Sequence, residues 1–206
     1  MAIQPFSDPE LYVLDNWARA VLFEGAMKAV RDKYATILGN VLDEVQKRYK
    51  ELKIRGVHPN NEEFNIGVGK AAWPSTDSSW PSGLWIGRIR VENVMSDDEG
   101  APGAGVWVNP PRDAALDMQQ TAQRLRDAAQ AILAPEEYNR LEVETYGKTQ
   151  AWIEYELSEP RAKLRQLLLM PKAHDFINCL VGHFETLAEF IPVMDEIARG
   201  GKQKHK

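Results

Sequence analysis

Tryptophan and arginine side chains that suit partner recognition gather between residues 73 and 90. Trp73 and Trp80 each precede a proline, which forces extended backbone, and they flank a polar loop. Arg88 and Arg90 follow in a strand-like segment. Indole rings stack on bases, sugars or peptides, and guanidinium groups pair with phosphates or carboxylates. These four residues are therefore the predicted contact surface for a ligand or partner.

Cys179 and His183 are one helical turn apart, and Asp175 stands one turn before them. A cysteine and a histidine at this spacing are candidates for a metal half-site or an activated thiolate. A tetrahedral site needs further ligands, and a single cysteine in an apolar helix is typical of a buried core position. The pattern favours a structural role.

Two acidic groups are the remaining candidates for metal binding. Glu92 lies in the predicted strand that begins at Leu84, and Asp97, Asp98 and Glu99 lie in the Gly- and Pro-rich turn that follows, which lacks the alternating oxygen ligands of a calcium loop. A second group alternates along the predicted hairpin 141–157 and would share one sheet face: Glu142, Glu144, Glu154 and Glu156. Such a face suits a divalent metal or a basic partner, but a solvated face is the favoured interpretation. The four glutamates share one face only if the hairpin has a three-residue loop or a bulge, because a two-residue turn would place glutamates and apolar residues on the same face. No metal and no cofactor is predicted.

The composition indicates a globular protein of 206 residues with a formal net charge of −5. This charge argues against nucleic-acid binding by the whole surface. A single cysteine excludes an intramolecular disulfide, and no secretory or membrane-spanning pattern occurs, so a cytoplasmic location is expected. We predict one domain over residues 1–199 and a disordered basic tail over residues 200–206.

The predicted elements begin with a helical region over residues 7–55, opened by a capping box of Ser7 and Glu10 and broken at Gly39–Asn40. Its many apolar residues make it a candidate surface for self-association. Residues 57–157 are predicted to form a sheet with an inserted helix over residues 113–134, capped by Asp113. Residues 160–199 are predicted to be helical, with one helix from Asp175 to Arg199.

The strand that begins at Leu84 alternates in character, with Trp85, Gly87 and Ile89 on one face. The opposite face would carry Leu84 and Ile86 together with the two arginines. We expect Trp85 to lie beneath a helix, with Gly87 leaving room for a large neighbour.

The fold class predicted from this order is α+β, with a single sheet of about five strands, mostly antiparallel or mixed, packed by helices. In element order alone, residues 7–157 resemble the restriction-endonuclease-like PD-(D/E)xK core. That resemblance implies a Mg²⁺ site for phosphodiester cleavage on the second and third strands. The segment "AGVWVNPP", in the third candidate strand, contains no carboxylate and no lysine. No catalytic residue is therefore assigned.

The predicted function is that of a non-catalytic interaction or accessory protein, which binds a protein or a nucleic acid through the tryptophan and arginine region. The alternatives are a divergent metal-dependent nuclease that uses Glu92, Asp97, Asp98 or Glu99, and a small-ligand sensor domain. No organised nucleophile or complete metal set occurs, which favours the first interpretation over an enzyme.

Overall fold

The computed structural model describes residues 7–57, 65–73, 83–90, 103–109, 116–157, 163–164, 166–167 and 174–200. The side chains of residues 8, 31, 54–57, 65, 85 and 88–90, and the burial of Gly83, lie outside this description. The chain divides into two compact units, residues 1–36 and residues 37–206, where the sequence predicts one domain over residues 1–199.

The first unit consists of α1 (Asp8–Asp15) and the beginning of α2 (Trp17–Arg48). The capping box is confirmed: Glu10 Oε2 accepts from the backbone N–H of Ser7 at 2.7 Å and from its hydroxyl at 2.6 Å. The predicted break at Gly39–Asn40 is wrong, because α2 runs through both residues. The break lies at Asn16 instead, whose side-chain amide donates to the carbonyl of Tyr12 at 2.9 Å and so satisfies a carbonyl at the end of α1.

The second unit is built on one six-stranded sheet with the order β1-β2-β3-β4-β6-β5, in which every neighbouring pair is antiparallel. The α+β fold class is therefore confirmed. The strands are β1 (Leu52–Val57), β2 (Asn65–Lys70), β3 (Gly83–Arg90), β4 (Gly103–Asn109), β5 (Leu141–Tyr146) and β6 (Gln150–Glu156). The sequence misses β1, because the spacing of Tyr49 and Leu52 continues the helical pattern of α2.

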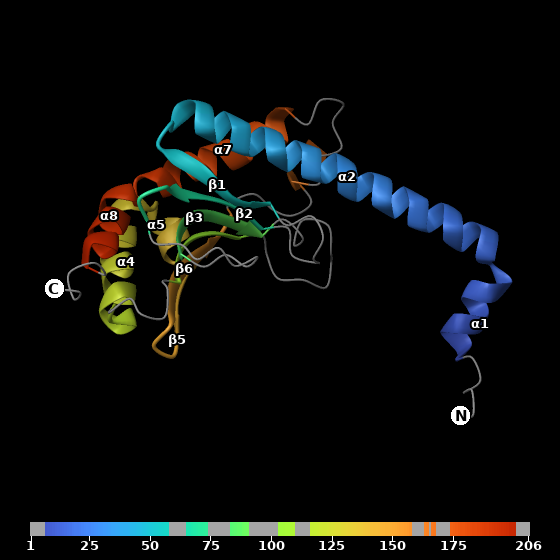
Figure 1. Cartoon of the computed structure of the whole chain (residues 1–206), viewed down its shortest axis with the longest axis horizontal. Coiled ribbons are helices and arrows are strands. Elements are labelled where there is room, and N and C mark those ends of the chain that lie inside the picture. Colours follow the sequence, from blue (N-terminus) through green and yellow to red (C-terminus); the bar gives the residue numbers. More distant parts are fainter. Residues whose placement is uncertain are drawn as a thin grey trace. The chain divides into compact units, whose positions relative to one another are not determined.

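Helices cover one face of this sheet (Figure 1). They are α4 (Met118–Ile132), the short α5 (Pro135–Tyr138), α7 (His174–Ala188) and α8 (Ile191–Gly200). α4 lies against β5 and β6, α7 against β3 and β4, and α8 against β3. The core between them contains fully buried apolar side chains from every layer, among them Ile86, Val106, Leu125, Phe176 and Leu187.

Two predicted helices differ from the structure at their ends. α4 begins at Met118 and its N-cap is Asp117, not the predicted Asp113: the Asp117 carboxylate accepts from the backbone N–H of Gln119 at 2.9 Å and of Gln120 at 3.1 Å. The single helix predicted from Asp175 to Arg199 is broken at Glu189–Phe190 into α7 and α8. Pro192 in the first turn of α8 explains the break, because it cannot donate to residue 188 and its ring clashes with that carbonyl in a continuous helix.

A β-bulge in β3 changes which of its residues face the helices. Ile86 and Ile89 pair with Val68 and Ile66, so three residue steps of β3 oppose two of β2. Leu84 and Ile86 are fully buried, and Gly87, with φ of +115°, approaches the Phe184 ring of α7. Because positions 66 and 68 share one face of β2, the prediction that positions 86 and 89 lie on opposite faces of β3 is wrong. The expected large neighbour of Gly87 is present.

The hairpin of β5 and β6 has the three-residue loop that separates its faces. Tyr146 pairs with Gln150 across residues 147–149, and Gly147 adopts φ of +55°. Val143 then pairs with Ile153 on the helix-covered face, and Glu142 pairs with Glu154 on the other. The predicted separation of carboxylates from apolar residues is confirmed.

Candidate functional site

Exposed apolar side chains concentrate in the N-terminal helices. We call residues 8–36 the arm. Among the described residues eleven large apolar side chains are exposed, and only Tyr146 lies outside the arm. The ten in the arm include Leu22 at 74%, Phe23 at 68% and Trp17 at 61%. Monomeric proteins rarely expose a contiguous apolar surface of this kind, which marks interaction sites.

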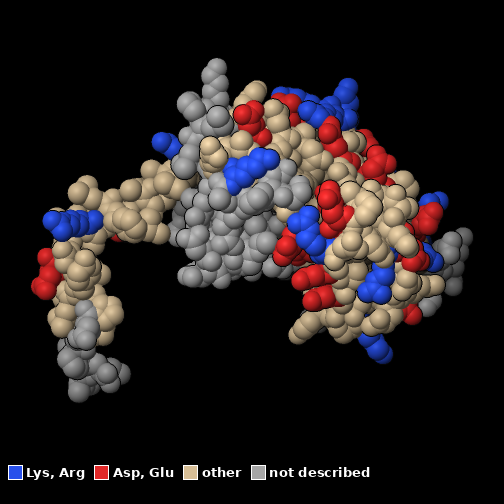
Figure 2. Space-filling model, turned by 180° about the vertical axis from the view of Figure 1, so that it is seen from behind, with Lys and Arg blue, Asp and Glu red and all other residues tan. Residues whose placement is uncertain are grey.

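The arm owes this surface to its sequence. Between Trp17 and Val30 only Arg19, Glu24 and Lys28 are charged, so apolar residues surround the helix rather than forming one narrow stripe. Figure 2 shows the visible part of the arm largely free of charged atoms, whereas acidic and basic side chains are mixed over the second unit. The arm is therefore the least polar surface that the structure describes.

Trp73, a predicted contact residue, is 3% exposed. Its indole N–H donates to Asp195 Oδ1 of α8 at 2.6 Å, and Lys70 Nζ donates to Asp195 Oδ2 at the same distance. The Lys70 ammonium also lies 5.9 Å from the Trp73 ring centroid, within range of a cation–π contact. These contacts join the end of β2 to α8, so Trp73 is placed to hold the fold.

Burial raises the pKa of Asp195, but hydrogen bonds from Lys70 and Trp73 and the charge of Lys70 outweigh it. The pKa of Asp195 therefore lies below its ordinary value of 3.8. A depressed pKa in the folded state means that the carboxylate stabilises the fold above pH 3.8 and that this contribution is lost as the pH falls through the lowered pKa.

We therefore expect the free energy of unfolding of the wild type to fall more steeply below about pH 4 than that of Asp195→Asn. The amide keeps an acceptor for Trp73 but cannot titrate. Urea unfolding at pH 3 to 6 measures the difference between the two proteins, which cancels the titration of other carboxylates such as Glu10 and Glu44. If the free energies of unfolding of the two proteins change in parallel from pH 6 to pH 3, the ionised Asp195 carboxylate does not stabilise the fold as assigned.

A second aromatic group lies on the sheet face opposite the helices. Trp107 of β4 and Trp152 of β6 stack with ring centroids 4.4 Å apart and an interplanar angle of 15°. They are paired in register, and register also places residue 85 beside Trp107 and Glu144 beside Trp152. In the sequence each tryptophan lies between two apolar residues of a predicted strand, which places it on the opposite face from them. The sequence did not show that the two strands are neighbours.

Carboxylates surround this tryptophan pair. Glu142, Glu144 and Glu156 are exposed, and Glu154 is half-buried with its side chain lying against Gly103. A phosphate backbone is repelled by such a surface. Within the described part of this face, the charge therefore disfavours nucleic acid.

Cys179 and His183 lie in α7, as predicted. His183 is 8% exposed, and its Nδ1 is 3.4 Å from the hydroxyl of Tyr155. Cys179 is half-buried. Among the described residues no group of three or more His, Cys, Asp or Glu side chains is arranged to hold a metal ion. In the described surroundings, His183 contributes to the contact between α7 and the sheet.

The remaining predicted residues cannot be placed in a site. Trp80, Glu92, Asp97, Asp98, Glu99 and the tail 201–206 lie outside the described residues. Arg88 and Arg90 belong to β3, but their side chains are not described.

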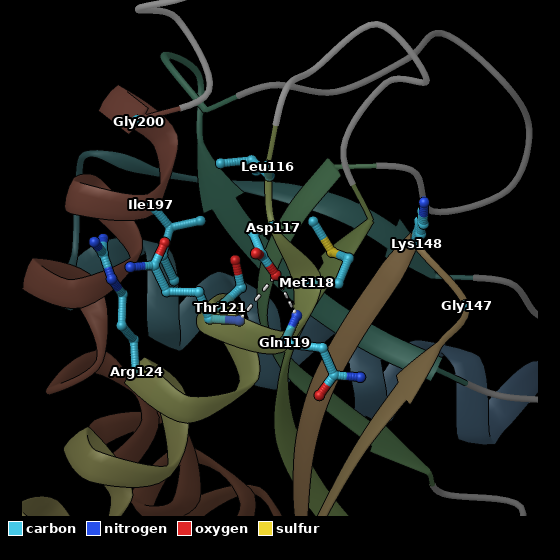
Figure 3. Close-up of a pocket in the computed structure, with 11 residues that line it drawn as sticks. Leu116, Asp117, Met118, Gln119, Thr121, Arg124, Gly147, Lys148, Ile197 and Gly200 are labelled. Carbon is cyan, nitrogen blue, oxygen red and sulfur yellow. Dashed lines mark hydrogen bonds between the residues drawn. The ribbon is translucent and has the colours of Figure 1, made fainter.

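An open hollow of about 710 Å³ lies beside the beginning of α4 (Figure 3). Its lining includes Leu116, Asp117, Thr121 and Ile197, with Lys148 on the β5–β6 hairpin. Asp117 already accepts from the first N–H groups of α4, as the dashed lines show. An anion would compete with this carboxylate for the same donors, so the hollow does not offer a helix N-terminus for anion binding.

Comparison of the chain with protein-family models, with curated protein sequences and with solved structures finds no match. In the described part of the chain no helix has both the length and the apolar character needed to cross a membrane. The fold itself thus defines the class: an α+β protein with an open antiparallel sheet, helices on one face and an apolar helical arm.

Proposed function

We propose that this protein is a non-catalytic interaction protein that binds a protein partner through its arm. The observation that carries the proposal is the concentration of ten exposed large apolar side chains between Leu11 and Val30. Burying an exposed Leu or Phe side chain contributes about 1.5–3 kcal/mol, so a few such residues suffice for specific association.

This proposal moves the contact surface from the tryptophan and arginine region to the arm. The burial of Trp73 and its bonds to Asp195 count against a ligand contact at that residue. The sparse charge of residues 17–30 suits an apolar protein surface rather than a phosphate backbone, which is bound mainly by Lys and Arg.

The test compares two sets of charged substitutions in epitope-tagged full-length protein, expressed in the cells from which the chain comes. Leu22→Asp with Phe23→Asp is expected to weaken partner binding at least about tenfold, because both side chains are exposed and apolar. Tyr146→Asp is the matched control, since Tyr146 is 70% exposed but lies outside the arm. Copurifying proteins, further copies of this chain included, are quantified by mass spectrometry.

Both variants should melt within about 2 °C of the wild type, because substitutions of exposed side chains change stability little. The same copurifying proteins in the same amounts with the arm variant and the Tyr146 variant would contradict the proposal.

A further inference from the structure

We infer that the partner of the arm is a second copy of this chain, and that the two arms pair antiparallel. This inference rests on the proposed function, because it identifies what covers the same surface. Its grounds are the spacing of the apolar residues, the distribution of charge along the arm and the bend between α1 and α2.

The apolar residues of α2 follow the spacing that helix pairing requires. Ala20, Phe23, Met27 and Val30 are separated by three, four and three residues, which is the alternation of a coiled-coil seam. The same alternation continues in sequence through Tyr34 and Ile37 to Val41, which is fully buried in the second unit. Phe23, Met27 and Val30 are 68%, 41% and 49% exposed. The apolar seam of α2 is thus buried in the second unit and exposed at Phe23, Met27 and Val30 of the arm.

Charge is distributed unequally between the two ends of the arm. Residues 8–15 contain three acidic residues, Asp8, Glu10 and Asp15, and no basic one. Residues 28–33 contain three basic residues, Lys28, Arg31 and Lys33, and one acidic residue. Two parallel arms would place like charges together at both ends, whereas two antiparallel arms place the acidic end of each beside the basic end of the other. Charge complementarity therefore selects the antiparallel arrangement.

The antiparallel arrangement is two-fold symmetric, as most homodimer interfaces are. Its axis falls near Val21, from which Tyr12 and Val30 are equidistant in sequence. α1 turns away from the direction of α2 at Asn16 (Figure 1). When the two α2 segments lie side by side, each α1 can therefore cross the partner's helix near residues 28–33. Tyr12 and Val30, 70% and 49% exposed, are then neighbours across the interface.

The first experiment measures the mass of the purified full chain by sedimentation equilibrium between about 1 and 50 µM. A dimer is expected for the wild type, and Phe23→Asp should raise its dissociation constant at least about a hundredfold. Lys28→Glu with Lys33→Glu should also weaken the dimer, and adding Asp8→Lys and Asp15→Lys to that variant, which leaves the capping box of Ser7 and Glu10 in place, should restore it. Charge reversal at both ends recreates attraction between antiparallel arms, so restoration is the specific result.

The second experiment determines the orientation. In a Cys179→Ser background, chains carrying Tyr12→Cys are mixed with chains carrying Val30→Cys and treated with a short bismaleimide. Antiparallel pairing predicts linkage between the two different chains and little linkage of either chain to itself. Linkage of each chain only to its own kind would indicate parallel arms and overturn the inference.

The failures of the two proposals are distinguishable. A wild-type chain that stays monomeric to 50 µM, while Leu22→Asp with Phe23→Asp abolishes capture of another protein, overturns the self-association and leaves the proposed function standing. A dimer that persists unchanged in every arm variant overturns the pairing of the arms, and it overturns the proposed function as well when the copurifying proteins are also unchanged in Leu22→Asp with Phe23→Asp.

Discussion

Replacing Gly87 with alanine is expected to lower the free energy of unfolding by about 3 kcal/mol or more. A Cβ at this position would lie 2.7 Å from Cζ of Phe184 and closer still to its Cε1. The backbone at Gly87 has φ of +115°, which residues with a Cβ adopt only with strain of about 1–3 kcal/mol. Overpacking against a buried ring adds about 1–3 kcal/mol. Urea unfolding monitored by circular dichroism measures the sum.

Gly39→Ala is the control for this substitution. Gly39 lies inside α2, and no atom of a neighbouring element lies within 4 Å of an added Cβ. Alanine is the better helix former by about 0.8–1 kcal/mol, so this variant should be as stable as the wild type or more stable. If both alanine variants unfold at the same urea concentration, that result would contradict the close contact between Gly87 and the Phe184 ring.

Replacing Trp73 with alanine is expected to lower the free energy of unfolding by about 3–5 kcal/mol, the usual cost of removing a buried tryptophan. Asp195 would also lose the indole donor that lies 2.6 Å away and helps to keep its pKa low. For a chain of this length the melting temperature should fall by roughly 10 °C. Differential scanning calorimetry at pH 7 provides the measurement.

Trp17→Ala is the matched change in the arm, where the side chain is 61% exposed. It should leave the melting temperature within about 2 °C of the wild type while weakening association through the arm. The reverse pattern, a stable Trp73→Ala protein with a specific binding defect, would restore Trp73 as a contact residue.

Local sequence patterns were sufficient to predict several secondary-structure features of the chain. The alternation of glutamates with apolar residues over 141–157 predicted both strands, their faces and the need for a three-residue loop, all of which the structure contains. The capping box of Ser7 and Glu10 in the first unit was equally local. These features follow from the order of neighbouring residues, because strand and helix periodicity are properties of the chain itself.

Errors arose where distant segments decide the local geometry. Gly87 permits a bulge, but the sequence near it does not show that one forms, because the bulge follows from pairing with β2 and from the approach of Phe184 on α7. The stacking of Trp107 on Trp152 similarly depends on β4 pairing with β6 rather than with β5. Strand order is a tertiary property, and periodicity within one strand does not determine it.

The sequence by itself determined that this protein is α+β with one sheet, mostly antiparallel or mixed, and that its N-terminal helices carry more apolar residues than one covering face needs. It did not determine which apolar residues are covered. Trp73 is buried beside Asp195, which lies 122 residues away and accepts its indole hydrogen, whereas Phe23 is exposed. Burial depends on what packs against a residue, and only the tertiary structure brings those partners together.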